Sequence, residues 1–331
     1  MQPSKTLFFA IIGLAIVIVI GMFLARLILA EPLDLPTGNE EIEIQLLVAP
    51  SIKPWIDRAA RSFNQANPRT QVRVVAANDL TPEGQFQITN PAETPPAAWI
   101  AEASFVVDMA RNQGVRFDEA QSVASTGLAW GSFNSKLDQF NQAYGPLTWA
   151  SLNAKGTSGD RLQVVIASPQ NSAEGLAAFI AATAGNRGTT TLTANDISAA
   201  DAWLTQTFGN RNTRIAATPA EDFATKGVSA GDFGLLSLAS WQESRLDERS
   251  DFTITPTEPN VSLDYPFAIW SGSQPAEKAA AVAFRNYLLA GAQQDGLVDF
   301  SLDPAATAPN TVQVDGVAAQ RLLDWANRQL R

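Results

Sequence analysis

The chain has 331 residues, with 23 Lys and Arg against 33 Asp and Glu, and it contains no His and no Cys. This composition excludes a Ser-His-Asp triad, a cysteine nucleophile, a zinc site of the usual His and Cys type, and disulfide bonds. A net charge of −10 also argues against nucleic acid as a partner, because binding to the phosphate backbone needs clustered Lys and Arg.

The first part of the chain is a candidate membrane span. Residues 7–25 read LFFAIIGLAIVIVIGMFLA and carry no charge, so they approach the length that crosses a bilayer. The apolar core of a signal peptide is usually shorter, so we predict an uncleaved anchor over residues 1–30. The alternative is a signal peptide that is cleaved after Ala30. Residues 31–40, which contain Pro and Gly, are typical of a short tether to a domain on the extracytoplasmic side.

Beyond the tether, short apolar runs alternate with helical patterns. A strand at 41–48, a helix at 55–63 and a strand at 71–76 form a unit that implies a parallel pair of strands. Further strands are predicted at 97–101, 162–167, 214–217, 233–236 and 267–270, and further helices at 173–184, 194–208, 276–290 and 317–331. The pattern predicts an α/β protein whose sheets are covered on both faces.

Four segments resemble those of extracellular solute-binding proteins of ABC transporters. Residues 48–75 have a small polar residue in the turn after a strand and a Phe-Asn pair in the next helix. Residues 98–104, AWIAEAS, resemble a third strand that ends in a serine, and residues 166–176 resemble a strand, a Pro turn and a Ser-Gly-Leu helix start. The fourth segment begins at residues 264–268, DYPFA. The order is most similar to the solute-binding-like domain associated with von Willebrand factor A modules, although no DxSxS metal motif occurs in this sequence.

The resemblance implies the type 2 periplasmic-binding fold, in which crossing strands join two α/β lobes. Lobe one would then comprise residues 41–131 and 262–331, and lobe two residues 132–261. We expect the chain to leave lobe one near Trp130 and to return near Asp264. A ligand would lie in the cleft, where the carboxyl ends of strands and the amino ends of helices converge.

The candidate ligand-binding residues of lobe one and of the hinge follow from this placement. Ser51 and Ser104 each follow a strand and precede a helix, so each is either a ligand contact or simply a helix N-cap. Trp130 and Tyr265 lie on the two predicted crossing segments. Their rings would contact the ligand or, in the alternative, pack between the lobes.

The candidates of lobe two are Ser168 and Ser172, in the turn before the helix at 173–184. Asn171 and Glu174 have the spacing of a capping box, so this turn also reads as a helix cap without a ligand. A carboxylate at Glu174 would repel an anion, and any neutralising charge would have to come from helix dipoles or from Lys53 or Arg161. We therefore expect a neutral or weakly charged solute, such as a sugar, rather than phosphate or molybdate.

These features predict a membrane-anchored, extracytoplasmic protein that captures a small solute by lobe closure, for an ABC permease. The alternative is a binding-protein fold kept as an accessory or interaction subunit of a membrane complex. An enzyme is disfavoured because the sequence shows no catalytic constellation, and we expect no metal and no cofactor.

Overall fold

The computed structural model describes residues 41–78, 80, 81, 84, 88, 96–305 and 311–330. The predicted membrane anchor and tether lie outside these residues. Within the described part of the chain, no helix is both long enough and apolar enough to cross a membrane.

Lobe one is built on a sheet that has five strands within the described residues, in the order β2-β1-β3-β12-β4. Their bounds are β1 (Ile42–Val48), β2 (Thr70–Ala76), β3 (Ala98–Ile100), β4 (Phe117–Ser122) and β12 (Pro266–Trp270). The predicted strand–helix–strand unit is confirmed, because β1 pairs in parallel with β2 and α2 (Lys53–Ala66) lies between them in the chain. β12 runs antiparallel to both β3 and β4, so the returning chain supplies the strand that lies between them.

Lobe two is built on a second sheet in the order β10-β5-β9-β6-β8, with β11 beside β5. The bounds are β5 (Thr126–Phe133), β6 (Val164–Ala167), β8 (Thr213–Ala216), β9 (Phe233–Ser237), β10 (Phe252–Pro256) and β11 (Ser262–Leu263). β6 is parallel to β8 and β9, whereas β5 is antiparallel to β9 and β10. The apolar runs predicted as strands at 162–167 and 233–236 are the central strands β6 and β9.

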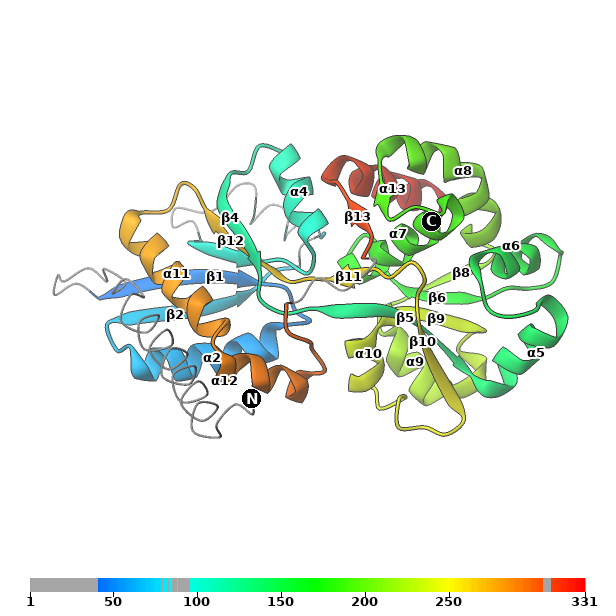
Figure 1. The fold of residues 1–331 in the computed structure, drawn as a ribbon, viewed down its shortest axis with the longest axis horizontal. Helices are drawn as coiled ribbons and strands as arrows, with labels where there is room; N and C mark the ends of the chain where they lie inside the picture. The colour runs from blue at the N-terminus through cyan, green and yellow to red at the C-terminus, as the bar shows by residue number, and fades with distance from the viewer. Residues whose placement is uncertain are drawn as a thin grey trace, which may run out of the picture. The chain divides into compact units, whose positions relative to one another are not determined.

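Two short connections join the lobes (Figure 1). Residues 123–125 lead from β4 of the first sheet to β5 of the second, and residues 264–265 lead back from β11 to β12. The predicted two-lobed α/β fold is therefore confirmed, and the returning connection contains Asp264. The outgoing connection precedes Trp130, which lies inside β5 rather than at the crossing.

Helices cover the sheets of both lobes (Figure 1). In lobe one they are α2, α4 (Ser104–Asn112), α11 (Pro275–Leu288) and α12 (Gly291–Asp295). In lobe two they are α5 (Asn134–Tyr144), α6 (Trp149–Thr157), α7 (Ala173–Arg187), α8 (Ala194–Phe208), α9 (Pro219–Lys226) and α10 (Leu238–Glu243). Two 3-10 turns follow α9 and α12, at η1 (Gly227–Ser229) and η2 (Gly296–Phe300).

The end of the chain is placed differently from the predicted division of lobes. The resemblance places all of residues 262–331 in lobe one, but β13 (Gln313–Val314) pairs with β7 (Thr191–Leu192) of lobe two. The last helix, α13 (Gly316–Gln329), packs on α7 and α8 as well as on α4. The physical reason is its apolar face, where Leu322 and Trp325 are buried.

Helix α7 lies at the centre of lobe two and presents its amino end to lobe one. Every residue from Ala173 to Ala184 is buried, as expected of a helix that is apolar on all sides. Gly175 lets the helix approach the preceding turn, because a Cβ at this position would lie 2.4 Å from the carbonyl oxygen of Ala167. The first turn of α7 is therefore fixed against the carboxyl end of β6.

Candidate functional site

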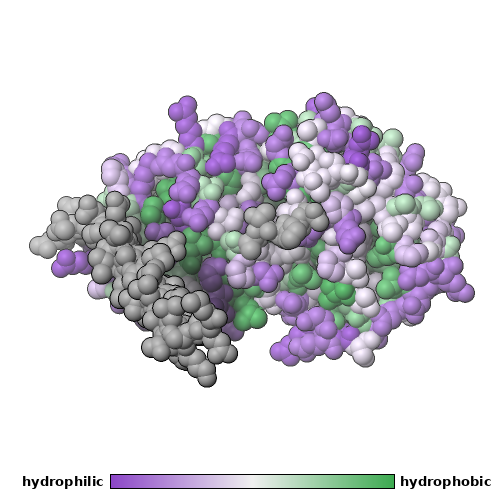
Figure 2. Space-filling model, viewed as in Figure 1, coloured by the Kyte–Doolittle hydropathy of each residue, from purple (hydrophilic) through white to green (hydrophobic). Residues whose placement is uncertain are grey.

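A cavity of about 890 Å³ lies between the lobes. Lobe one contributes the turn before α2 and the segment around η2, and lobe two contributes the amino ends of α7, α9 and α10. Helix amino ends carry free N–H groups and a partial positive charge, so several hydrogen-bond donors converge here. In the view of Figure 2, the surface is mostly hydrophilic to weakly polar, and the two halves meet at a notch in the lower edge.

One wall of the cavity is formed by the carboxylate of Glu102, which follows β3 of lobe one. Its Oε2 accepts hydrogen bonds from the backbone N–H of Ala173 (2.7 Å), the hydroxyl of Ser172 (3.3 Å) and the backbone N–H of Glu174 (3.4 Å). Its Oε1 accepts a hydrogen bond from the hydroxyl of Ser51 at 3.0 Å. Glu102 thus reaches from lobe one onto the amino end of α7 in lobe two.

The surroundings of Glu102 change the pKa of its carboxyl. Burial raises this pKa, and the neighbouring charge of Glu174 raises it further. The hydrogen bonds from Ser51, Ala173 and Glu174 act in the opposite direction, but they do not outweigh burial. The charged form of Glu102 is therefore less favoured here than in water.

Another carboxylate, that of the buried residue Glu174, lies in the same wall. Its Oε1 accepts hydrogen bonds from the backbone N–H of Ser237 (2.7 Å) and the hydroxyl of Ser240 (2.6 Å), at the start of α10. Two of the helix amino ends that face the cavity therefore already hold a carboxylate from the chain itself.

Three of the six predicted ligand-binding residues line the cavity, namely Ser51, Ser172 and Tyr265. Ser51 donates to Glu102 and accepts a long hydrogen bond from the hydroxyl of Tyr265 at 3.4 Å. Ser172 is the N-cap of α7, because its hydroxyl accepts from the backbone N–H of Glu174 at 3.1 Å. The predicted capping box between Asn171 and Glu174 is therefore wrong, since the cap begins one residue later and the Glu174 side chain turns to α10.

The other three predicted residues lie elsewhere in the structure. The hydroxyl of Ser168 donates to the side chain of Gln170 at 2.8 Å, within the turn before α7. Trp130 is buried, and its ring centroid lies 5.1 Å from that of Trp149 and 6.3 Å from that of Phe233, so it packs against aromatic residues of lobe two. The backbone N–H of Ser104 donates to Asp264 at 2.7 Å, in a separate cavity of about 240 Å³.

Sequence reasoning missed the role of Glu102. The sequence signal was a single acidic residue between Ala101 and Ala103 at the end of an apolar strand, where a charge is not expected unless it has partners. Its main partner, Ala173, is 71 residues away in the chain, so no local pattern could identify it.

The charge of the cavity wall is negative. The acidic residues that line it are Glu102, Glu174, Glu221, Glu243 and Asp299, and no Lys or Arg is among the described lining residues. Lys53, a predicted source of positive charge, instead pairs with Asp57 at 2.6 Å. No group of three or more His, Cys, Asp or Glu side chains in the described residues is arranged to hold a metal ion.

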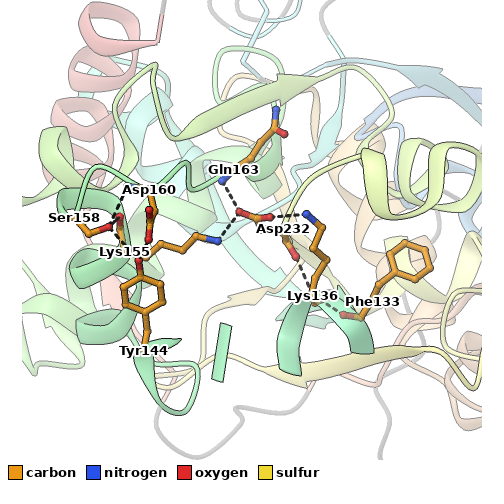
Figure 3. A network of polar contacts seen from close by, with 9 residues as sticks. Phe133, Lys136, Tyr144, Lys155, Ser158, Asp160, Gln163 and Asp232 are labelled. Atoms are coloured by element: carbon orange, nitrogen blue, oxygen red, sulfur yellow. Dashed lines mark hydrogen bonds and ion pairs between the residues drawn. The ribbon is translucent and has the colours of Figure 1, made fainter. Parts of the chain in front are cut away.

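A second polar network lies within lobe two (Figure 3). The carboxylate of Asp232 accepts hydrogen bonds from Lys155 (2.9 Å), Lys136 (3.1 Å) and the backbone N–H of Gln163 (3.1 Å). None of these four residues is among the described residues that line the cavity. Because Gln163 precedes β6 and Asp232 precedes β9, the network joins these strands to α5 and α6 and has a structural role.

Comparisons with known proteins agree with this fold. The sequence model of the family described as bacterial extracellular solute-binding protein matches residues 44–300. No curated protein matches the chain in sequence. The structures discussed next are all below 25% identical to this chain, so they bear on the fold alone.

Three solved structures illustrate the similarity. The iron-bound HitA from Pseudomonas aeruginosa is 13% identical, with a TM-score of 0.64, and the match covers 87% of this chain and 99% of that one. The periplasmic binding protein AfuA from Actinobacillus pleuropneumoniae, with fructose-6-phosphate bound, is 14% identical, with a TM-score of 0.63 over 87% and 98% of the two chains. A periplasmic thiamin binding protein is 15% identical, with a TM-score of 0.63 over 90% and 99%.

Proposed function

Because the chain belongs to the family of bacterial extracellular solute-binding proteins, we propose that it captures a small solute in the cavity between its lobes and passes it to a membrane permease of an ABC transporter. The observation that carries this proposal is the cavity itself, which has about 890 Å³ and polar groups from both lobes. A pocket of this size accommodates a small organic molecule. A solute that contacts both lobes would favour the closed arrangement by its difference in affinity for the two states.

The lining favours a neutral or positively charged solute. Its acidic side chains repel an anion, and the amino ends of α7 and α10 already receive the carboxylates of Glu102 and Glu174. Sugars and organic cations therefore fit this wall better than sulfate or phosphate. This agrees with the expectation from the sequence that the solute is neutral or weakly charged.

A screen of the purified full-length chain in a nonionic detergent tests the proposal. Sugars, amino acids, organic cations such as thiamin, and oxyanions are compared by the shift in unfolding temperature, and positive solutes are then measured by calorimetry. We expect at least one neutral or cationic solute to raise the unfolding temperature in a concentration-dependent way. A well-folded chain that binds no member of these classes would contradict the function.

The membrane anchor is part of the same proposal. The apolar run at residues 7–25 would hold the chain in the membrane with residues 31–331 on the extracytoplasmic side. Amino-terminal sequencing of the membrane-bound protein determines whether residues 1–30 are retained. A mature amino terminus near Glu31 would instead indicate a cleaved signal peptide.

A second candidate is an accessory or interaction subunit of a membrane complex, derived from a solute-binding protein. The observation that favours it is Glu102, because the chain's own carboxylate fills part of the cleft. A kinship with the domain associated with von Willebrand factor A modules belongs with this candidate. The accessory-subunit function becomes the better interpretation if the folded chain binds no solute.

A further inference from the structure

Glu102 makes the contacts that a bound anion would make at the start of α7. Free N–H groups at the amino end of a helix form a site for anions, because the helix dipole adds to their hydrogen bonds. Here Oε2 of Glu102 receives the N–H of Ala173 at 2.7 Å, together with the Ser172 hydroxyl and the Glu174 N–H. The observed occupant of this position is a carboxylate, so the geometry is suited to an anion.

The same carboxylate also contacts lobe one. Its Oε1 receives the hydroxyl of Ser51 at 3.0 Å, so donors from both lobes converge on one carboxylate group. The backbone that carries Glu102 is fixed, because Ala101 and Ala103 on either side of it are fully buried. Glu102 is therefore held in this position by its own lobe as well as by α7.

We propose that Glu102 is a specificity-determining residue, a built-in carboxylate ligand that excludes oxyanion solutes and bridges the two lobes. The inference deepens the proposed function, because it concerns the solute class of the same cavity. A second anion cannot reach the N–H of Ala173 while Glu102 accepts from it, because the Glu102 side chain occupies that position. Removal of the Glu102 side chain would leave the donors of Ser51, Ser172 and Ala173 free for a small anion.

The carboxylate of Glu174 does not move into the position of Glu102 when the Glu102 side chain is removed. Its carboxylate accepts from the backbone N–H of Ser237 at 2.7 Å and from the hydroxyl of Ser240 at 2.6 Å. These bonds direct it toward α10 and away from the first N–H groups of its own helix. The vacated position is therefore available to a small anion from solution.

The test is anion binding by the full-length chain in a nonionic detergent at neutral pH, measured by calorimetry with acetate and with sulfate. We expect Glu102→Ala to bind at least one of these anions at least tenfold more tightly than the wild-type chain does. The control is Glu277→Ala, which removes a carboxylate from the exposed start of α11, where Glu277 accepts from the N–H of Gln274 at 2.9 Å. We expect no such gain from this control, although it also removes a carboxyl group.

A double variant locates the gained site. Ala173 is the first residue of α7, where proline is tolerated, and Ser172 before it is extended, with φ −146° and ψ 134°. Glu102→Ala with Ala173→Pro removes the closest N–H donor, so we expect the gained anion affinity to fall by at least tenfold. If Glu102→Ala does not fold, Glu102→Ser is expected to show the same gain.

Two results would overturn the proposal. One is a folded Glu102→Ala chain, or Glu102→Ser chain, whose anion affinity equals that of the wild type. The other is an equal gain in Glu277→Ala, which would make the effect one of net charge. Failure of the solute screen would contradict the proposed function but would leave this measurement unchanged, so the two failures are distinguishable.

Discussion

The backbone N–H of Ala173 donates to the carboxylate of Glu102 across 2.7 Å, although the two residues belong to opposite lobes. The bond lies at the start of a helix that is buried along most of its length. The contact makes the first turn of α7 one of the links between the lobes, in addition to the two connecting segments and the packing of α13.

The first prediction is that the stability of the protein depends on pH through Glu102. Its pKa is raised in the folded protein, mainly by burial and then by Glu174, above the ordinary value of 4.5. The folded state therefore binds this proton more tightly than the unfolded state does. Relative to Glu102→Gln, the free energy of unfolding of the wild type should rise as the pH is lowered from 7 toward 4.5, by at most about 1.4 kcal/mol per pH unit.

Chemical denaturation of both chains across this pH range measures the difference. The comparison cancels the carboxylates that do not interact with Glu102, because they are present in both chains. A difference that stays constant with pH, or that decreases as the pH is lowered, would contradict the raised pKa of Glu102.

The second prediction concerns the packing at the start of α7. A Cβ at Gly175 would lie 2.4 Å from the carbonyl oxygen of Ala167 and 2.8 Å from the backbone nitrogen of Pro169, so backbone atoms would have to move. Gly175→Ala should therefore lower the free energy of unfolding by about 1–3 kcal/mol, despite the better helix propensity of Ala. Gly272→Ala is the matched control, because a Cβ there meets nothing within 4 Å. An equal effect of the two substitutions on the unfolding midpoint would contradict this account.

The sequence was informative where local signals agreed with the tertiary structure. The helix predicted at 194–208 has the same bounds as α8, because Thr193 caps its start and Gly209 follows its end. The inner strands β3, β6, β9 and β12 were visible as apolar runs, since all of their residues are buried. Strands β4 and β10 were not predicted, because they are partly exposed and carry polar residues. Helices α5, α6, α9 and α10 were not predicted. They are short, and several of them have few buried residues, so their patterns are weak.

The site was only partly predictable for a different reason. Ser51 and Ser172 were found because turns after strands lie at the cleft in this fold. The role of Glu102 depends on its contacts with Ser51 and Ala173, which are 51 and 71 positions away in the chain. Ser104 instead contacts Asp264, which is 160 positions away. Such pairings follow from the tertiary arrangement of the lobes, which short motifs do not encode.

The third prediction distinguishes Ser51 from Ser104, for which the sequence patterns predict the same role. Ser51 lines the large cavity and donates to Glu102, whereas Ser104 contacts Asp264 in the smaller cavity. For a solute identified in the screen, Ser51→Ala should weaken binding by about 0.5–1.5 kcal/mol, the usual contribution of one hydrogen bond. Ser104→Ala should leave the dissociation constant unchanged while lowering stability. Calorimetry at one temperature compares the two, and a larger loss of affinity in Ser104→Ala would move the solute site to the smaller cavity.

The last prediction concerns the network around Asp232 in lobe two (Figure 3). Burial alone would raise the pKa of Asp232, but the hydrogen bonds and charges of Lys155 and Lys136 outweigh it and hold this pKa below 3.8. The group therefore contributes stability above pH 3.8, and this contribution is lost as the pH falls through the lower pKa of the folded state. Asp232→Asn should lower the free energy of unfolding at pH 7 by about 1.5–3 kcal/mol, because the side chain is largely buried and its hydrogen bonds are charge-assisted.

The control is Asp251→Asn, which breaks the pair with Arg249. The Asp251 side chain is 59% exposed, so this substitution should lower the free energy of unfolding much less. Denaturation curves at pH 7 and at pH values below 3.8 should show the Asp232→Asn deficit shrinking with acidification. A deficit that is independent of pH would mean that Asp232 stabilises lobe two through packing rather than through its charge.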